Sequence, residues 1–503
     1  MNLAVLHSWI LTLITFTPLV GALLLVLSPR RDREIRWFAL GISLLTFVLS
    51  LHLLVHFDKA KAGFNFELDR AWIAAPNIHY HLGVDGVSMW LVVLTTFLTP
   101  LCVLISWTSI QERVKEFFIL LLVMETALLG VFVALDLFVF YFFWEATLIP
   151  MALLIGMFGH GRKIYAAVKF FLYTMVASVF MLAAILWLYA KTGTFDFVVL
   201  QNTVHTIPGY AAASFWLFLG FFIAFAVKVP LFPFHTWLPD AHVEAPTAGS
   251  VLLAGVLLKM GTYGMLRFDL GLFPEQSRAN ASWIMVLALI GIIYGALVAL
   301  VQPNMKKVIA YSSVSHLGFV VLGIFSFTTA GLDGATYVML AHGISTGGLF
   351  MLAGILYERR HTYDISEFGG LATPMPNYAA FFLFIVLASG GLPLLNGFVG
   401  EFLVLSGAFQ AKAIYGILGA TGVIWAAGYL LWMYQRVFFG KVTHEVNNTL
   451  PDLNLREKTA LVPAAIMALV MGVAPVFWLN TIDPAVQSVL APFAQMASRV
   501  VGQ

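Results

Sequence analysis

Residues 215–233 read FWLFLGFFIAFAVKVPLFP, an apolar run without charge that ends in a lysine and two prolines. A lysine at the centre of a bilayer costs roughly 2.5–3.5 kcal/mol, so Lys228 is expected to be functional or paired. Pro230 and Pro233 remove backbone donors and break the helix. Transporters place ion sites where a charge lies beside a broken membrane helix. The stretch therefore predicts movement of protons or small cations across a membrane.

The composition is that of a polytopic membrane protein. The chain has 503 residues, of which 61% are hydrophobic and 10% charged, with a mean hydropathy of +0.92. Its net charge of +2 gives no indication of nucleic-acid binding. One cysteine, Cys102, excludes an internal disulfide framework and a cysteine-ligated iron–sulfur cluster. The arginine cluster at 30–36 follows the first apolar helix, which favours a spanning helix over a signal peptide.

Apolar runs of about 20 residues, each long enough to cross a bilayer, recur along the chain. They predict an all-α fold of about fourteen spans, near 9–28, 36–55, 84–107, 116–133, 136–157, 164–190, 213–240, 247–267, 282–301, 307–327, 333–357, 377–411, 414–438 and 459–480. With the N-terminus outside, the inner loops hold about twice as many basic residues as the outer segments, as the positive-inside rule requires. We expect a multi-pass protein of the bacterial inner (cytoplasmic) membrane in that orientation.

Polar residues recur at nearly one spacing along the chain. The separation between Lys228 and Glu401 closely matches that between Glu145 and His316 and that between Lys169 and His342. A spacing of five spans predicts two repeats of inverted topology, with discontinuous helices near 228–233 and 390–400. The predicted units are N-terminal helices, a first repeat, a second repeat, and a C-terminal loop, helix and tail, at 1–110, 111–270, 271–440 and 441–503.

Ionisable side chains inside these spans include Glu125, Glu145, Lys169, Lys228, Lys259, His316, His342 and Glu401. Their summed insertion cost would exceed about 10 kcal/mol, which favours a shared hydrated interior. Glu145 has no charged neighbour within seven residues, so a buried carboxylate there must be protonated or paired. Lys228 is its natural partner, and a pair that opens and closes would make the lysine a proton relay element.

Structural roles for the same residues remain open. A buried Glu–Lys pair can be a structural contact, Lys169 can extend toward the head groups, and Glu125 can form a bond between helices. Each histidine alone is more often a hydrogen-bonded core residue than a relay. Together, however, the charges favour ion conduction over a scaffold whose buried charges only set helix register.

The remaining motifs do not predict a metal or a cofactor site. His235 and His242 lie seven residues apart near the helix break, without an evident third ligand. His79 and His81 lie in an outer segment with no cysteine or carboxylate cluster, and no glycine-rich nucleotide loop is present. Redox chemistry is therefore expected in other subunits.

Several motifs in this order resemble the antiporter-like membrane subunits of respiratory complex I, and the likeness covers almost the whole chain. They are GVDG at 83–86, FWE at 143–145, KVPL at 228–231, TWLPDAH at 236–242, APTAGS at 245–250, AYSSVSHLG at 310–318 and the segment 394–401. The resemblance implies fourteen helices, two inverted five-helix repeats, two broken helices and a polar axis in the membrane plane.

The resemblance also implies roles for single residues. Glu145 and Lys228 match a gating pair, Lys259 matches a central lysine, His316 and His342 match bridging histidines, and Glu401 matches a terminal acidic residue. Electron transfer elsewhere would perturb the pair and drive a proton toward Glu401. The implied partners are other membrane-arm subunits, including the antiporter-like subunits L and N, which would lie beside this chain. FMN, iron–sulfur clusters and quinone would be held by partner subunits.

Two rival functions share this fold and most of the polar residues. One is a subunit of a multi-component Na⁺/H⁺ antiporter, and the other is the membrane arm of an energy-conserving hydrogenase. Sodium-driven transport without NADH would favour the first, and nickel in the purified complex would favour the second.

Overall fold

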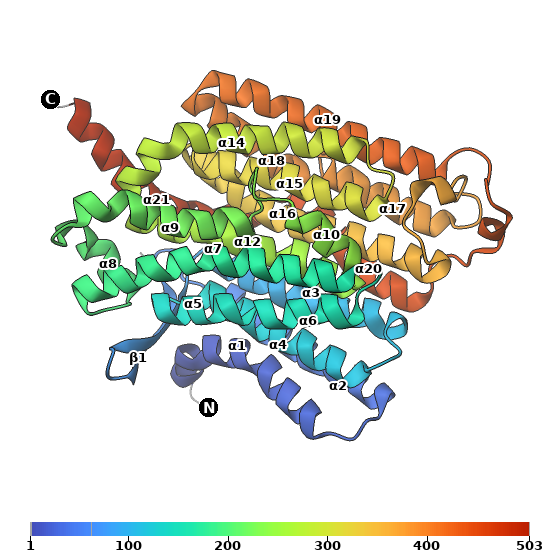
Figure 1. Ribbon diagram of the computed structural model, residues 1–503, viewed down its shortest axis with the longest axis horizontal. Helices are drawn as coiled ribbons and strands as arrows, with labels where there is room; N and C mark the ends of the chain where they lie inside the picture. Colours follow the sequence, from blue (N-terminus) through green and yellow to red (C-terminus); the bar gives the residue numbers. More distant parts are fainter. Residues whose placement is uncertain (1–2, 62, 502–503) are drawn as a thin grey trace.

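The structure, a computed structural model, describes residues 3–61 and 63–501. It is a bundle of long helices that run side by side across the molecule (Figure 1). The first helix begins and the last helix ends at the same end of the bundle, which we call the terminal end; the loops at the opposite end include the link between α1 and α2. The bundle confirms the prediction of a mostly helical, multi-pass chain.

The helices and strands follow one another along the chain with short connections. The α-helices are α1 (Leu3–Leu27), α2 (Asp32–His56), α3 (Ser88–Ser109), α4 (Val114–Val133), α5 (Leu137–Ala146), α6 (Leu148–Phe158), α7 (Lys163–Thr192), α8 (Phe197–Thr203), α9 (Tyr210–Lys228), α10 (Trp237–Glu244), α11 (Thr247–Leu252), α12 (Leu258–Gly264), α13 (Leu270–Leu272), α14 (Pro274–Leu300), α15 (Met305–Ile324), α16 (Thr329–Arg360), α17 (Pro376–Ser389), α18 (Asn396–Ala411), α19 (Ala413–Phe438), α20 (Leu455–Val473) and α21 (Val476–Val501). The strands are β1 (Asn65–Ile73) and β2 (Ile78–Val84).

Within residues 3–61 and 63–501, twelve helical segments are long and apolar enough to cross a membrane, and a bent pair, α20 and α21, brings the number to 13. The predicted span 377–411 is not among them, because it is divided into α17 and α18, which have 14 and 16 residues. The predicted last span, 459–480, was wrong at its end. Its helix α20 stops at Val473, and α21 continues at an angle of 70°.

The outer segment expected between the spans 36–55 and 84–107 contains a β-hairpin that was not predicted. There β1 and β2 pair as an antiparallel hairpin at the terminal end of the bundle. Its strand β2 is buried over its last four residues and carries His81 into the protein. The hairpin was not predicted because its strands lie outside the long apolar runs on which the span assignment rested.

Both predicted discontinuities are present. Helix α9 ends at Lys228, and the chain resumes as α10 only at Trp237. Helix α17 ends at Ser389, and α18 begins at Asn396. In the second break Gly391 has a φ of +75°, a conformation that favours glycine, and a Cβ there would lie 3.0 Å from Glu401 Oε2.

Two elements occupy the centre of the bundle. The most apolar stretches of residues 247–272 and of α16 are entirely buried. Those of α2 and α19 are only one-third buried, so these two helices lie at the outside of the bundle. The central segment 247–272 is not a regular α-helix, because π-helical turns at Leu253–Leu257 and Met265–Asp269 interrupt it. Such π-turns often mark functional positions. Lys259 lies two residues after the first of them.

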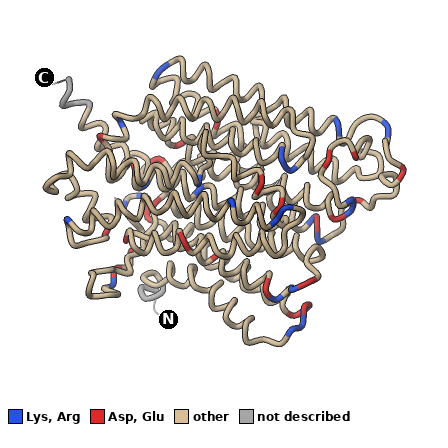
Figure 2. Tube along the Cα trace, viewed as in Figure 1, with Lys and Arg blue, Asp and Glu red and all other residues tan. Residues whose placement is uncertain are grey.

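Charged residues lie at the two ends of the bundle, and others lie between the ends (Figure 2). One charged residue inside the bundle is Arg267, the last residue of the predicted span 247–267. The structure buries it, and its guanidinium pairs with the carboxylate of Asp85. Burial alone would raise the pKa of Asp85, but Arg267 outweighs it and holds that pKa below its ordinary value.

Candidate functional site: a buried lysine–histidine–glutamate line

Lys259 and His342 form the first contact of the site, between the two central helical segments. Lys259 Nζ donates to His342 Nδ1 over 2.7 Å and also donates to the carbonyl of Ala254. That carbonyl belongs to the π-turn before α12, so the irregular backbone supplies the lysine with a polar partner. Lys259 is fully buried and His342 is 4% exposed, so neither is solvated from outside.

His316 and Glu401 form the second contact, between α15 and α18. His316 Nδ1–H donates to Glu401 Oε1 over 2.8 Å. In that tautomer His316 Nε2 accepts from the hydroxyl of Tyr429, on α19, over 3.2 Å. A protonated His316 would instead donate to both partners. The imidazole can therefore gain or lose a proton without losing its contacts.

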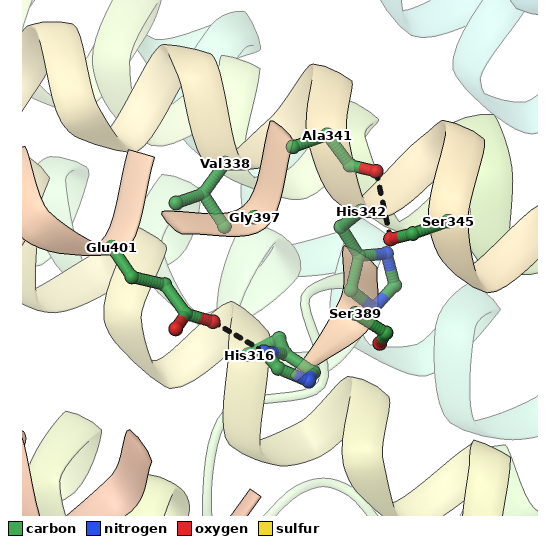
Figure 3. A pocket seen from close by; sticks show the side chains of 8 residues that line it. All are labelled: His316, Val338, Ala341, His342, Ser345, Ser389, Gly397 and Glu401. Atoms are coloured by element: carbon green, nitrogen blue, oxygen red, sulfur yellow. Dashed lines mark hydrogen bonds and ion pairs between the residues drawn. The ribbon is translucent and has the colours of Figure 1, made fainter. Parts of the chain in front are cut away.

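A small cavity lies between these two contacts (Figure 3). Its volume is about 10 Å³, close to what one water molecule needs. The rings of His316 and His342 are 5.8 Å apart between centroids, and no direct hydrogen bond joins them among the described side chains. Among the described residues, His342 Nε2 and Glu401 Oε2 are buried and have no hydrogen-bond partner. Both residues line the cavity, together with Ser345 and Ser389. A water there would have the two to four polar partners that a buried water requires.

The expected pair between Glu145 and Lys228 is not in contact. No ion pair within 4.0 Å joins them among the described residues. Lys228 Nζ instead lies 3.4 Å from Thr147 Oγ1, and 5.2 and 5.6 Å from the ring centroids of Trp144 and Phe170. Lys228 is fully buried, so cation–π attraction and the Thr147 hydroxyl replace the expected carboxylate. Glu145 remains close enough for electrostatic attraction.

Glu145 faces a different environment. It is partly buried and lines an apolar groove of about 680 Å³ that also includes Leu120, Phe142 and Leu182. Phe142 in this groove is 54% exposed, so the groove opens onto the outside of the bundle. The prediction of a contact pair was wrong because a span assignment does not fix the rotation of a helix about its axis.

Two further ionisable residues lie outside this line. Lys169 Nζ pairs with Asp240 Oδ2 over 2.7 Å, so its partner is on α10. Glu125 on α4 is fully buried, and its carboxyl group forms no ion pair within the described part of the chain. The geometry thus joins four of the six predicted relay residues, Lys259, His316, His342 and Glu401, and leaves Glu145 and Lys228 as a separate group.

Sequence reasoning missed Tyr429 and Asn396. Tyr429 is one of two tyrosines near the end of the apolar helix α19, and nothing local distinguishes it. Asn396 Nδ2 donates to the carbonyl of Ala341 over 3.1 Å, which fixes the start of α18 against α16. Asn396 is the first residue of α18 after the helix break, and this position in the sequence could have identified it.

A polar cluster at the terminal end involves His81. Its Nδ1–H donates to Asp196 Oδ2 over 2.6 Å, and Nε2 contacts Glu67 Oε1 at 3.1 Å. Burial alone would lower the pKa of His81, but the bonds to Asp196 and Glu67 outweigh it and raise that pKa. Burial alone would raise the pKa of Asp196, but the hydrogen bond from His81 outweighs it and lowers that pKa. The expectation that no carboxylate cluster lies near His81 was wrong: Glu67 comes from the neighbouring strand β1, and Asp196 comes from a distant part of the chain.

Residues 134–425 match the family model described as NADH:quinone oxidoreductase/Mrp antiporter, TM. Over 491 residues the chain is 47% identical to NADH-quinone oxidoreductase subunit M of Rhodobacter capsulatus, with 95% of each chain covered. The chain belongs to the family of NADH-quinone oxidoreductase M subunits. This confirms the resemblance found in the motifs.

Solved structures agree with the family. A chain in respiratory complex I from Thermus thermophilus with bound NADH superposes with a TM-score of 0.85 at 34% identity, covering 96% of this chain and all of the other. A chain of the Mrp complex from Dietzia has a TM-score of 0.84 at 19% identity, covering 98% of this chain and all of the other, which shows a shared fold. All four joined relay residues lie within the matched segment.

Proposed function

We propose that this chain is the proton-translocating subunit M of an NADH:quinone oxidoreductase and carries protons along the line from Lys259 through His342 and His316 to Glu401. The observation that carries this is the pair of buried hydrogen bonds, Lys259–His342 and His316–Glu401, on either side of a cavity of water size. A static support for helix packing would not need a cavity flanked by unpartnered polar atoms.

The order of proton steps follows from the donors. Lys259 gives a proton to His342 Nδ1, and His342 releases one from Nε2 into the cavity. A water in the cavity passes this proton to the hydrogen-bonded pair of His316 and Glu401. The two residues share the proton, while the hydroxyl of Tyr429 keeps its contact with His316. Lys228 and Glu145 act before Lys259. The electrostatic attraction between these two residues changes when electron transfer occurs elsewhere in the complex.

The finer architecture belongs to the same proposal. We count α17 and α18 as one broken span and α20 as the last, which makes fourteen crossings. Residues 111–270 and 271–440 are two inverted repeats, between the N-terminal helices at 1–110 and the C-terminal part at 441–503. The matching spacing of Glu145 and His316 and of Lys228 and Glu401, and the helix breaks at Lys228 and Ser389, support this.

The partners follow from the family. We infer that the chain sits in the membrane arm beside the antiporter-like subunits L and N, in a bacterial inner membrane with its N-terminus outside. FMN, iron–sulfur clusters and quinone belong to partner subunits, because the one cysteine of the sequence, Cys102, cannot ligate a cluster alone. The acidic Glu401 supports an M-type chain, since the resemblance implies lysine there in L and N.

The test is proton pumping by the assembled complex. Lys259→Ala in the complex, reconstituted into liposomes, should abolish NADH-driven acidification while NADH oxidation by an artificial acceptor and complex assembly remain. Glu145→Gln should reduce pumping less than Lys259→Ala does, because Glu145 acts on the line only through its electrostatic attraction for Lys228. Lys191→Ala, which changes an exposed lysine at the end of α7, is the matched control and should pump normally.

Normal proton stoichiometry in the Lys259→Ala complex would contradict the proposal. Sodium-driven proton movement in vesicles without NADH would instead favour an Na⁺/H⁺ antiporter subunit. Nickel in the purified complex would favour a membrane hydrogenase.

A further inference from the structure

Three histidines meet at the terminal end of the bundle, away from the proton line. His7 lies near the start of α1, while His52 and His56 lie one turn apart at the end of α2. The ring centroids are 4.9 Å apart for His7 and His52, 4.8 Å for His7 and His56, and 4.1 Å for His52 and His56. One ring nitrogen from each lies within 4.8 Å of the other two. No role in the proposed function uses these residues.

Their hydrogen bonds leave ring nitrogens free to bind something. His7 Nε2 and His52 Nε2 are buried without a hydrogen-bond partner among the described residues. His56 Nδ1–H donates to the carbonyl of His52 over 3.2 Å, which leaves Nε2 as the lone-pair nitrogen of that ring. Metal-binding histidines commonly hold their other nitrogen in this way, with a backbone carbonyl as acceptor. Two buried orphan nitrogens in one cluster need an explanation that packing alone does not give.

The residues around the three histidines indicate which class of ligand the cluster would bind. Phe66 packs against the cluster, with ring centroids 5.9 Å from His7 and 6.2 Å from His52, and neither a carboxylate nor a cysteine belongs to the group. Calcium and magnesium prefer oxygen ligands, whereas neutral imidazoles suit zinc and copper. A zinc ion with Zn–N distances of about 2.0–2.1 Å would draw the three nitrogens together by rotation of the side chains. His56 is exposed and gives access from outside.

We propose that His7, His52 and His56 form a three-histidine site for a zinc-class divalent ion, with water as the fourth ligand. The ion ties the start of α1 to the end of α2. This arrangement is independent of proton translocation, because none of the three residues contacts Lys259, His316, His342 or Glu401. The i, i+4 spacing of His52 and His56 was visible in the sequence, but the contribution of His7 requires the fold.

Zinc binding by the full-length chain tests the site. The chain, purified without a polyhistidine tag and placed in lipid nanodiscs, is titrated with Zn²⁺ against a competing chromophoric chelator. Wild type should bind one more equivalent than His56→Gln, in which affinity at this site should fall at least about 100-fold, beyond the loss typical of a supporting residue. His205→Gln is the matched control. It removes an imidazole at the same end of the bundle, 3.5 Å from Glu275, and should leave the equivalent intact.

Two variants distinguish the loss of a metal ligand from a folding defect. His56 is exposed, so His56→Gln should fold as wild type does, and His7→Gln removes the ligand from the other helix. Zinc should raise the unfolding temperature of wild type and of His205→Gln, but not of His56→Gln or His7→Gln. Equal zinc stoichiometry and affinity in wild type and His56→Gln would overturn the proposal, and so would the absence of any bound equivalent in wild type. Neither result would bear on pumping.

Discussion

The two helix breaks of this chain hold their charges in different ways. At the second break, Glu401 pairs with His316, and a cavity of water size separates that pair from His342 and Lys259. At the first break, Lys228 lies between a threonine hydroxyl and two aromatic rings, out of contact with Glu145. The second region is a line along which a proton can pass by small movements. The first is a single buried charge whose state depends on a carboxylate it does not touch.

The comparison predicts the largest effect at Lys259. Lys259→Met should reduce NADH-driven pumping by about 100-fold or more, because it removes the proton donor of the line. Lys228→Met should reduce pumping less, since the line from Lys259 onward stays intact. Fluorescence quenching of a pH dye in proteoliposomes measures both. Equal losses in the two variants would mean that the regions act as one unit and the distinction is wrong.

A second prediction concerns Asp196, at the terminal end. The raised pKa of His81 stabilises the fold below its ordinary value of 6.5, and this stabilisation is lost as pH rises through the raised pKa. The lowered pKa of Asp196 stabilises the fold above 3.8, and that contribution is lost as pH falls through the lowered pKa. Asp196→Asn should therefore cost about 2 kcal/mol near pH 6 and less near pH 9.

Thermal unfolding of the detergent-solubilised protein at the two pH values measures this loss. Glu275→Gln is the control, because the Glu275–His205 pair is far more exposed and should contribute about 0–1 kcal/mol. A loss independent of pH would show that the His81 charge does not contribute.

Tyr429→Phe sharpens the description of the second region. It removes the hydroxyl that contacts His316 Nε2 and should slow pumping by about fivefold, corresponding to about 1 kcal/mol for one hydrogen bond. Assembly should be unchanged, since the ring remains. The ratio of protons pumped to NADH oxidised is the measurement. Tyr434→Phe on the same helix, whose hydroxyl contacts the carbonyl of Ala379, is the matched control.

The smallest effect is expected at Thr147. Thr147→Val removes the hydroxyl that accepts a hydrogen bond from Lys228 Nζ and should lower stability by about 1 kcal/mol. Pumping should change little if Trp144 and Phe170 hold the lysine. Loss of pumping equal to that of Lys228→Met would show that Thr147 belongs to the proton path. Thermal unfolding and dye quenching on the same preparation separate these outcomes.

The sequence was most informative where an ionisable residue lies in an apolar span. Lys259, His316, His342 and Glu401 were all found in this way, and so were the helix breaks at Lys228 and near Ser389. Contacts that depend on helix rotation were not predictable: Glu145 was assigned to Lys228 but lines an outward groove. The hairpin was not predicted because β1 and β2 lie between the apolar runs that defined the spans. Tyr429 meets His316 only when α19 packs against α15, and His7 meets His52 and His56 only when α1 packs against α2.

The most direct test of the central claim is a cryo-electron microscopy map of the assembled complex at a resolution that shows ordered water. The account predicts a water in the cavity among His316, His342 and Glu401, within hydrogen-bond distance of His342 Nε2 and Glu401 Oε2. A dry cavity closed by apolar side chains, with Lys259–His342 and His316–Glu401 isolated from each other, would contradict it.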